Sequence, residues 1–174
     1  MTACSAGDIL TDAYGRVAGL VPTVVDGLSP EELLWRPDAD ANHIAWLVWH
    51  LTRVQDDHLA GVGGIEQVCT AAGWAERFGL PYDDDALGYG QSSEEVGAFR
   101  LEDPSLLTGY HAAVQAMTKQ VVDRVQSEDD FGRVVDDSWD PPVTVAVRLV
   151  SVVNDTMQHL GQAAYVRGLL QRRR

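Results

Sequence analysis

The chain has 174 residues, of which 45% are hydrophobic and 22% charged, as expected of one ordinary packed domain. Its formal net charge of −13 argues against nucleic acid and anionic membranes as partners, because both require a basic face. No apolar run reaches about 18 residues, so we expect no transmembrane helix.

The composition also predicts the compartment. Residues 1–8 lack a basic region followed by an apolar run, so we expect no secretory signal. The two cysteines, Cys4 and Cys69, show neither metal-ligand spacing nor a disulfide framework. Free thiols are usual in a reducing compartment. We therefore expect a cytoplasmic protein in which residues 1–174 form a single domain.

Apolar residues recur every three or four positions, which predicts an almost wholly helical chain. The first helix is expected over residues 8–25, with Pro22 kinking or ending it near Val21. Its predicted inward stripe is Ile9, Ala13, Val17, Leu20 and Val24. A short helical turn follows at residues 28–33, where Ser29 can cap and Glu32 can complete a capping box.

The second helix is expected over residues 42–60, capped by Asp40 or Asn42 and ended by the glycines that follow. Residues 61–104 then form a long connection with weak helical pieces near 70–78 and 93–99. A connection of this length predicts a crossover rather than a tight hairpin.

The third helix is expected over residues 103–125, and a polar stretch at 127–142 separates it from a fourth helix over 143–170. The third helix has an apolar stripe of Leu107, Tyr110, Val114, Met117, Val121 and Val125. Four amphipathic helices predict an all-α four-helix bundle with a long crossover between helices two and three.

Polar residues interrupt the inward stripe of the fourth helix. That stripe reads Val152, Asp155, His159, Gln162, Val166 and Leu169. Asp155 and His159 are four residues apart, so their side chains can converge. A buried carboxylate beside a buried imidazole is either a hydrogen-bonded pair or two ligands of one metal ion, because unpaired burial is costly.

The second helix supplies a third candidate ligand. His50 shares the face of Leu47 and Val54, which points into the bundle. With Asp155 and His159 it would form a three-ligand site with one open position, the arrangement of a catalytic metal site. Among the other histidines, His43 suits a helix start, His111 an ordinary half-buried place, and His58 is the best replacement for His50.

Two segments resemble a known superfamily. Residues 42–56, Asn-His-Ile-Ala-Trp-Leu-Val-Trp-His-Leu-Thr-Arg-Val-Gln-Asp, resemble the second helix of DinB/YfiT-like proteins. Residues 155–162, Asp-Thr-Met-Gln-His-Leu-Gly-Gln, resemble the last helix, which usually carries His-x-x-x-His. Asp155 replaces the first of these histidines, and the similar mycothiol-dependent maleylpyruvate isomerase, whose N-terminal domain is related, has a carboxylate there.

The resemblance implies an up-down-down-up bundle, often dimeric, with His50, Asp155 and His159 as metal ligands. It also implies a metal-dependent transferase that joins a low-molecular-weight thiol, such as mycothiol, to a small electrophile. Zn²⁺ is the expected metal and Ni²⁺ a possible one. No catalytic group is expected beyond a metal-bound water or thiol; Gln162 could support a ligand, and Arg148 could meet an anionic thiol or substrate. The alternatives are a non-catalytic metal-binding module and a metal-dependent hydrolase.

Overall fold

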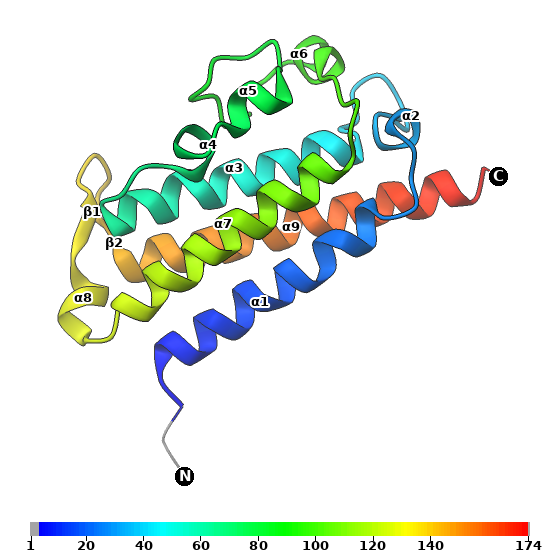
Figure 1. Cartoon of the computed structure of the whole chain (residues 1–174). Coiled ribbons are helices and arrows are strands. Elements are labelled where there is room, and N and C mark those ends of the chain that lie inside the picture. Colours follow the sequence, from blue (N-terminus) through cyan, green and yellow to red (C-terminus); the bar gives the residue numbers. More distant parts are fainter. Residues whose placement is uncertain (1–3, 174) are drawn as a thin grey trace.

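The computed structural model describes residues 4–173, and it confirms an all-α bundle. Residues 1–3, to which the expectation about a secretory signal also refers, lie outside this range. The long helices are α1 (Ala6–Val25), α3 (Ile44–Gly63), α7 (Ser105–Arg124) and α9 (Val145–Gln171). In Figure 1, α1 and α9 run from left to right, and α3 and α7 run the opposite way. Both α1 and α3 pack against α7 and α9.

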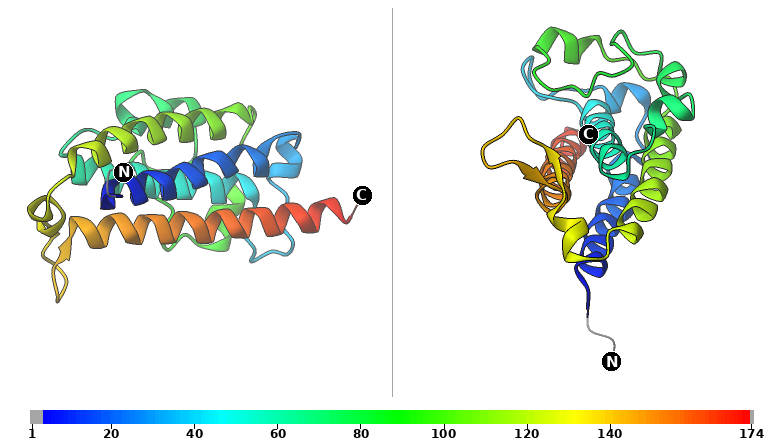
Figure 2. Two further views of the ribbon diagram at one scale, coloured as in Figure 1. Left: turned by 90° about the horizontal axis from the view of Figure 1, so that it is seen from below. Right: turned by 90° about the vertical axis from the view of Figure 1, so that its left-hand side faces the viewer.

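Short elements fill the connections between the long helices. They are α2 (Pro30–Leu33), α4 (Val68–Ala71), α5 (Trp74–Phe78), α6 (Ser93–Ala98) and α8 (Glu128–Gly132), with the strands β1 (Val134–Asp136) and β2 (Val143–Thr144). The strands pair antiparallel, with Val134 opposite Thr144. This hairpin was not predicted from the polar stretch 127–142, because its strands are too short to show alternation. It projects beside the first turns of α9 (Figure 2).

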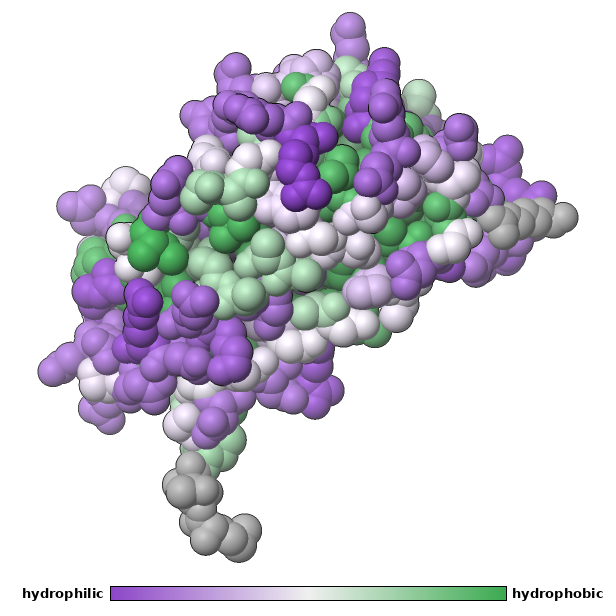
Figure 3. Space-filling view, in the orientation of Figure 1, coloured by the Kyte–Doolittle hydropathy of each residue, from purple (hydrophilic) through white to green (hydrophobic). Residues whose placement is uncertain are grey.

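On the face shown in Figure 3, hydrophilic residues dominate the periphery, and a paler, weakly hydrophobic band crosses the middle. Among residues 4–173, none of the helices combines the length and apolar character needed to cross a lipid bilayer.

The first helix ends at Val25, as its predicted range has it, but it begins two residues earlier than predicted, at Ala6, after a capping box between Ser5 and Asp8. Pro22 does not end the helix at Val21: it lacks the N–H that would bond the carbonyl of residue 18, but its own carbonyl accepts a hydrogen bond of 2.8 Å from the Asp26 N–H. The predicted stripe was also partly wrong, since Ile9 and Leu20 are exposed. The buried face consists of Leu10, Tyr14, Val17, Val21, Val24 and Val25 together with Gly7.

The helix that carries the central part of the core, α3, begins later than predicted. Its N-cap is His43, whose Nδ1 accepts a hydrogen bond of 3.0 Å from the Trp46 N–H, in place of Asp40 or Asn42. The helix extends to Gly63, and Gly64 ends it in the left-handed conformation. By contrast, the predicted inward stripe of α7 is buried at every position.

A buried polar cluster fastens the crossover to α3. The Asp56 carboxylate accepts hydrogen bonds from the main-chain N–H groups of Val68 and Cys69, at 2.8 and 2.7 Å, and from the Tyr110 hydroxyl at 2.7 Å. Arg53, which is 1% exposed, lies 3.6 Å from Asp56 and donates to the Ala86 carbonyl at 3.1 Å. Cys69, predicted in a loop, is buried in α4 as part of this arrangement.

Two histidines are buried as neutral groups, and they should make the fold sensitive to acid. Burial lowers the pKa of both His43 and His111 to about 4. His111, predicted to be half-buried, is 2% exposed and packs its Nδ1 3.1 Å from the Thr52 hydroxyl. Because an unfolded histidine titrates near pH 6.5, the unfolded state takes up protons first as the pH falls.

We expect the free energy of unfolding to be highest above about pH 6.5 and to fall as the pH drops towards 4. The slope should approach roughly 1.4 kcal/mol per pH unit for each buried histidine. Urea titrations between pH 7 and 4.5 measure it, and His111→Leu should remove about half of this contribution. An unchanged slope in that variant would contradict the assignment of His111.

Candidate metal centre

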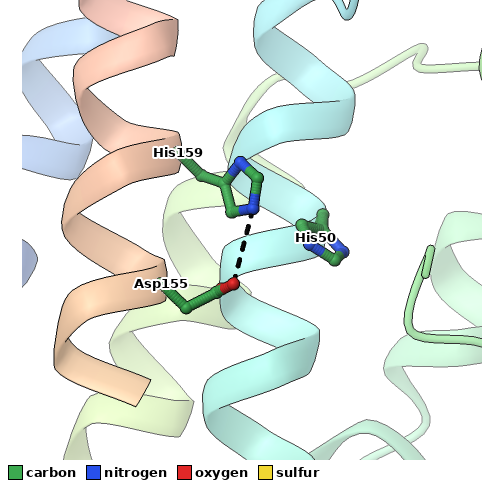
Figure 4. Close-up of side chains that lie close together, drawn as sticks. All are labelled: His50, Asp155 and His159. Carbon is green, nitrogen blue, oxygen red and sulfur yellow. Dashed lines mark ion pairs between the residues drawn. The ribbon is translucent and has the colours of Figure 1, made fainter. Parts of the chain in front are cut away.

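Three side chains from two helices converge in the bundle. His50 lies in the middle of α3, and Asp155 and His159 lie one turn apart on the facing stretch of α9 (Figure 4). Each offers a ligand atom, and these atoms lie within 4.8 Å of one another. Asp155 Oδ1 is 3.5 Å from His159 Nε2. This group can therefore hold a metal ion, and the structure brings together the three residues that the sequence singled out.

Hydrogen bonds fix which nitrogen of each histidine is available. His50 Nδ1 contacts the carbonyl oxygen of Leu87, which can only accept, so Nδ1 carries the proton. His159 Nδ1 donates in the same way to Gln162 Oε1 at 3.1 Å. In the neutral form of each ring, which is the form that binds a metal, the unprotonated nitrogen is then Nε2. Metal-bound histidines usually have their second nitrogen held in this manner.

The carboxylate supports the same interpretation. Asp155 Oδ2 is buried and has no hydrogen-bond partner among the described residues. A buried, unpartnered carboxylate oxygen is costly, and a bound cation removes that cost. Two imidazole nitrogens and one carboxylate oxygen form a donor set that suits Zn²⁺ and neighbouring divalent ions. The residues present thus fit a divalent metal.

The two histidines differ in electrostatic environment. Burial lowers the pKa of His50, so its ring is neutral at pH 7. The neighbouring Asp155 raises the pKa of His159 through its hydrogen bond. This contact between His159 and Asp155 is the hydrogen-bonded pair that the sequence left open as the alternative to a metal site. The side chains of His159 and Asp155 are 19% and 23% exposed, so the centre opens to solvent on the α9 side.

Aromatic rings pack against the candidate metal centre. Trp46 stacks on the His50 ring with centroids 4.7 Å apart, and its indole N–H donates to Gln91 at 2.7 Å. Tyr89 meets the His50 ring edge-on at 5.1 Å. Tyr89 and Gln91 come from the crossover, as does Leu87. None of these three residues could be assigned to the site from the sequence, because the local pattern of a loop does not indicate which helix the loop covers.

Gly88 was also missed, although its neighbouring glycine and turn composition could have drawn attention to it. Its φ of +96° lies in the left-handed region. A Cβ at this position would lie 2.8 Å from His50 Nδ1 and 3.0 Å from Trp46. Gly88 therefore lets the main chain approach closely enough for the Leu87 carbonyl to bind the His50 ring.

The substitution Gly88→Ala is expected to displace the Leu87 carbonyl and lower the affinity for a divalent metal by about 10- to 100-fold, as loss of an outer hydrogen-bond partner does. Gly90→Ala is the matched control. Gly90 also has a positive φ, of +70°, but a Cβ there meets nothing within 4 Å. Both variants should lose about 1–3 kcal/mol of stability from backbone strain. Equal metal affinities in the two variants, measured by chelator competition, would contradict the role of Gly88.

The remaining predicted residues have different surroundings. Gln162 is exposed, so its predicted inward position was wrong, yet it reaches back to His159. Arg148 bonds Asp136 of β1 at 3.0 Å and lies 3.2 Å from His58 Nδ1. His58, the replacement ligand considered from the sequence, is not part of the three-residue group.

Comparisons with known proteins place the chain in a family. No protein with a curated function matches it significantly. A structure titled as a conserved protein from Enterococcus faecalis is similar, with a TM-score of 0.89, 28% identity, and coverage of 97% of this chain and 98% of that one. The family model for mycothiol-S-transferase matches residues 13–172, which confirms the resemblance to DinB/YfiT-like proteins. The chain therefore belongs to the mycothiol-S-transferase family.

Proposed function

We propose that this protein is a metal-dependent thiol S-transferase that uses a low-molecular-weight thiol such as mycothiol. The observation that carries the proposal is the donor set of the centre: two histidines with Nε2 free and an unpartnered buried oxygen of Asp155. Family membership supports the transfer of a thiol. We further propose Zn²⁺ as the native metal, with Ni²⁺ as the alternative, and a cytoplasmic homodimer as the working form.

The chemistry follows from the residues. His50, Asp155 and His159 would hold the ion, and Gln162 would keep His159 in the right tautomer. A bound divalent ion lowers the pKa of a thiol ligand, so that thiolate is present near neutral pH. In the transfer the sulfur lone pair forms the C–S bond, and the leaving group departs with the electrons of the bond that breaks. Trp46 and Tyr89 limit the access of water to the thiolate.

The test is conjugation of a chlorinated nitroaromatic to mycothiol by the purified protein, with and without zinc. The release of chloride measures the reaction. Zinc-dependent turnover supports the proposal. Zinc binding without turnover with any of mycothiol, bacillithiol and glutathione would instead indicate the non-catalytic module. Zinc-dependent cleavage of ester substrates without thiol would indicate the hydrolase.

A further inference from the structure

A cleft of about 280 Å³ begins at the candidate metal centre and follows α9 towards its first turns. Asp155 lies at one end and Arg148 with His58 at the other. The cleft is also lined by six apolar or aromatic side chains, Val54, Tyr89, Trp139, Val143, Val147 and Val152, and by the polar side chains of Ser151 and Asn154. The cleft therefore joins the centre to a second, chemically different region.

Two exposed side chains in these walls need a reason to be apolar. Trp139, in the hairpin loop that stands beside α9 (Figure 2), is 67% exposed, and Val147 is 51% exposed. Single exposed apolar residues are common, but an exposed tryptophan and an exposed valine that line the same cleft suit an apolar ligand. The indole ring favours a flat apolar body that can lie against it.

The far end of the cleft carries the cation Arg148, which pairs with Asp136 at 3.0 Å, and His58, which lies 3.0 Å from Asp57. Arg148 Nη2 donates a hydrogen bond to the Asp136 carboxylate, while Nη1 lies beside the His58 ring. Asp136 and Asp57, the carboxylates nearest to Arg148 and His58, line the neighbouring hollow with Gly61 and Val135 and do not line this cleft. Arg148 lines both hollows, so a carboxylate in this cleft can bind the part of the guanidinium that Asp136 does not use.

The spacing of the two ends sets the size of the ligand. Arg148 and Asp155 are seven residues apart on one helix, so they are separated by about 10 Å along its axis. An arginine side chain spans several ångströms of this distance. A single aromatic ring with a carboxylate on one side and a reactive carbon on the other fits the remainder.

We propose that this cleft binds the electrophilic acceptor, and that the acceptor is a planar apolar compound with a carboxylate that Arg148 binds. That the bound compound accepts a thiol rests on the function proposed above. The binding itself is independent of turnover. It can therefore be tested even if no thiol proves to be a donor.

The probe is 4-chloro-3-nitrobenzoate, with the neutral 4-chloro-3-nitrobenzamide as its matched partner. Titration calorimetry of the full chain, without thiol, is expected to show the benzoate binding at least about tenfold more tightly, the ratio that one charge-assisted hydrogen bond supplies. Arg148→Met should remove this preference and leave the affinity for the amide unchanged. If both compounds bind the native protein equally, the proposal is overturned.

A second variant guards against a folding defect caused by the loss of the Arg148–Asp136 pair. Ser151→Asp adds a negative charge to the cleft at an exposed position without removing an apolar wall residue, and it should weaken benzoate binding about tenfold while changing the affinity for the amide much less. Val150→Asp, at a position 62% exposed that does not line the cleft, should change neither affinity. A benzoate preference that survives Arg148→Met but disappears with a chelator would place the carboxylate on the metal and overturn the proposal.

Discussion

Replacement of His159 with alanine is expected to abolish stable binding of a divalent metal. The variant keeps His50 and Asp155, but two donors on different helices hold an ion far less firmly than three. The loss of affinity should exceed the roughly 10- to 100-fold that removal of an outer hydrogen-bond partner costs. Metal content after purification and competition with a chromophoric chelator measure the effect. Thiol conjugation should disappear with the metal.

His58→Ala provides the matched control, since it removes a partly exposed histidine outside the three-residue group. It should bind metal as the native protein does. Zinc should also raise the unfolding temperature of the native protein and of His58→Ala, but not of His159→Ala, because a ligand stabilises the fold to which it binds. Equal zinc content in the native protein, His50→Ala and His159→Ala would contradict the central claim.

The second large effect is expected at Asp56. Asp56→Ala leaves the Arg53 guanidinium buried without its carboxylate and removes the acceptor for the N–H groups of Val68 and Cys69. Losing one partner of a buried pair costs about 3–5 kcal/mol of the free energy of unfolding. Urea unfolding at pH 7 measures this loss, and trypsin should cleave the crossover sooner.

The matched control for Asp56 is Asp123→Ala. Asp123 also pairs with a cation, Lys119 at 2.9 Å, but both side chains are more than half exposed. Exposed pairs of this kind contribute about 0–1 kcal/mol. If the two variants unfolded at the same urea concentration, the buried cluster would not have the role we assign to it.

The residues that the sequence predicted best belong to regular helices with one apolar face. The stripe of α7 is buried as predicted because its spacing allows a single inward face. In α1, apolar residues occupy neighbouring faces, and spacing could not choose between the set with Ile9 and Leu20 and the set with Leu10 and Val21. Tertiary packing against α7 and α9 made that choice.

The same distinction holds for the candidate site. His50, Asp155 and His159 could be brought together from the sequence because helical periodicity places each on an inward face, and the structure shows them adjacent. Their role as ligands stays a prediction. The contacts of Leu87, Gly88 and Tyr89 with the site could not be predicted, since a crossover without periodicity does not indicate which helix it packs against. The fastening of that crossover to Asp56 depends on main-chain groups, which carry no residue-specific signal.

The contact between the Leu87 carbonyl and His50 has a consequence for how relatives of this protein can diverge. A main-chain carbonyl is supplied by any residue, so evolution is free to exchange the side chain at position 87 without altering the protonation of the histidine. The selective pressure falls instead on the next position, where φ is +96° and a side chain would strike the ring. Among homologues that keep the histidine, we expect variety at position 87 and invariant glycine at 88.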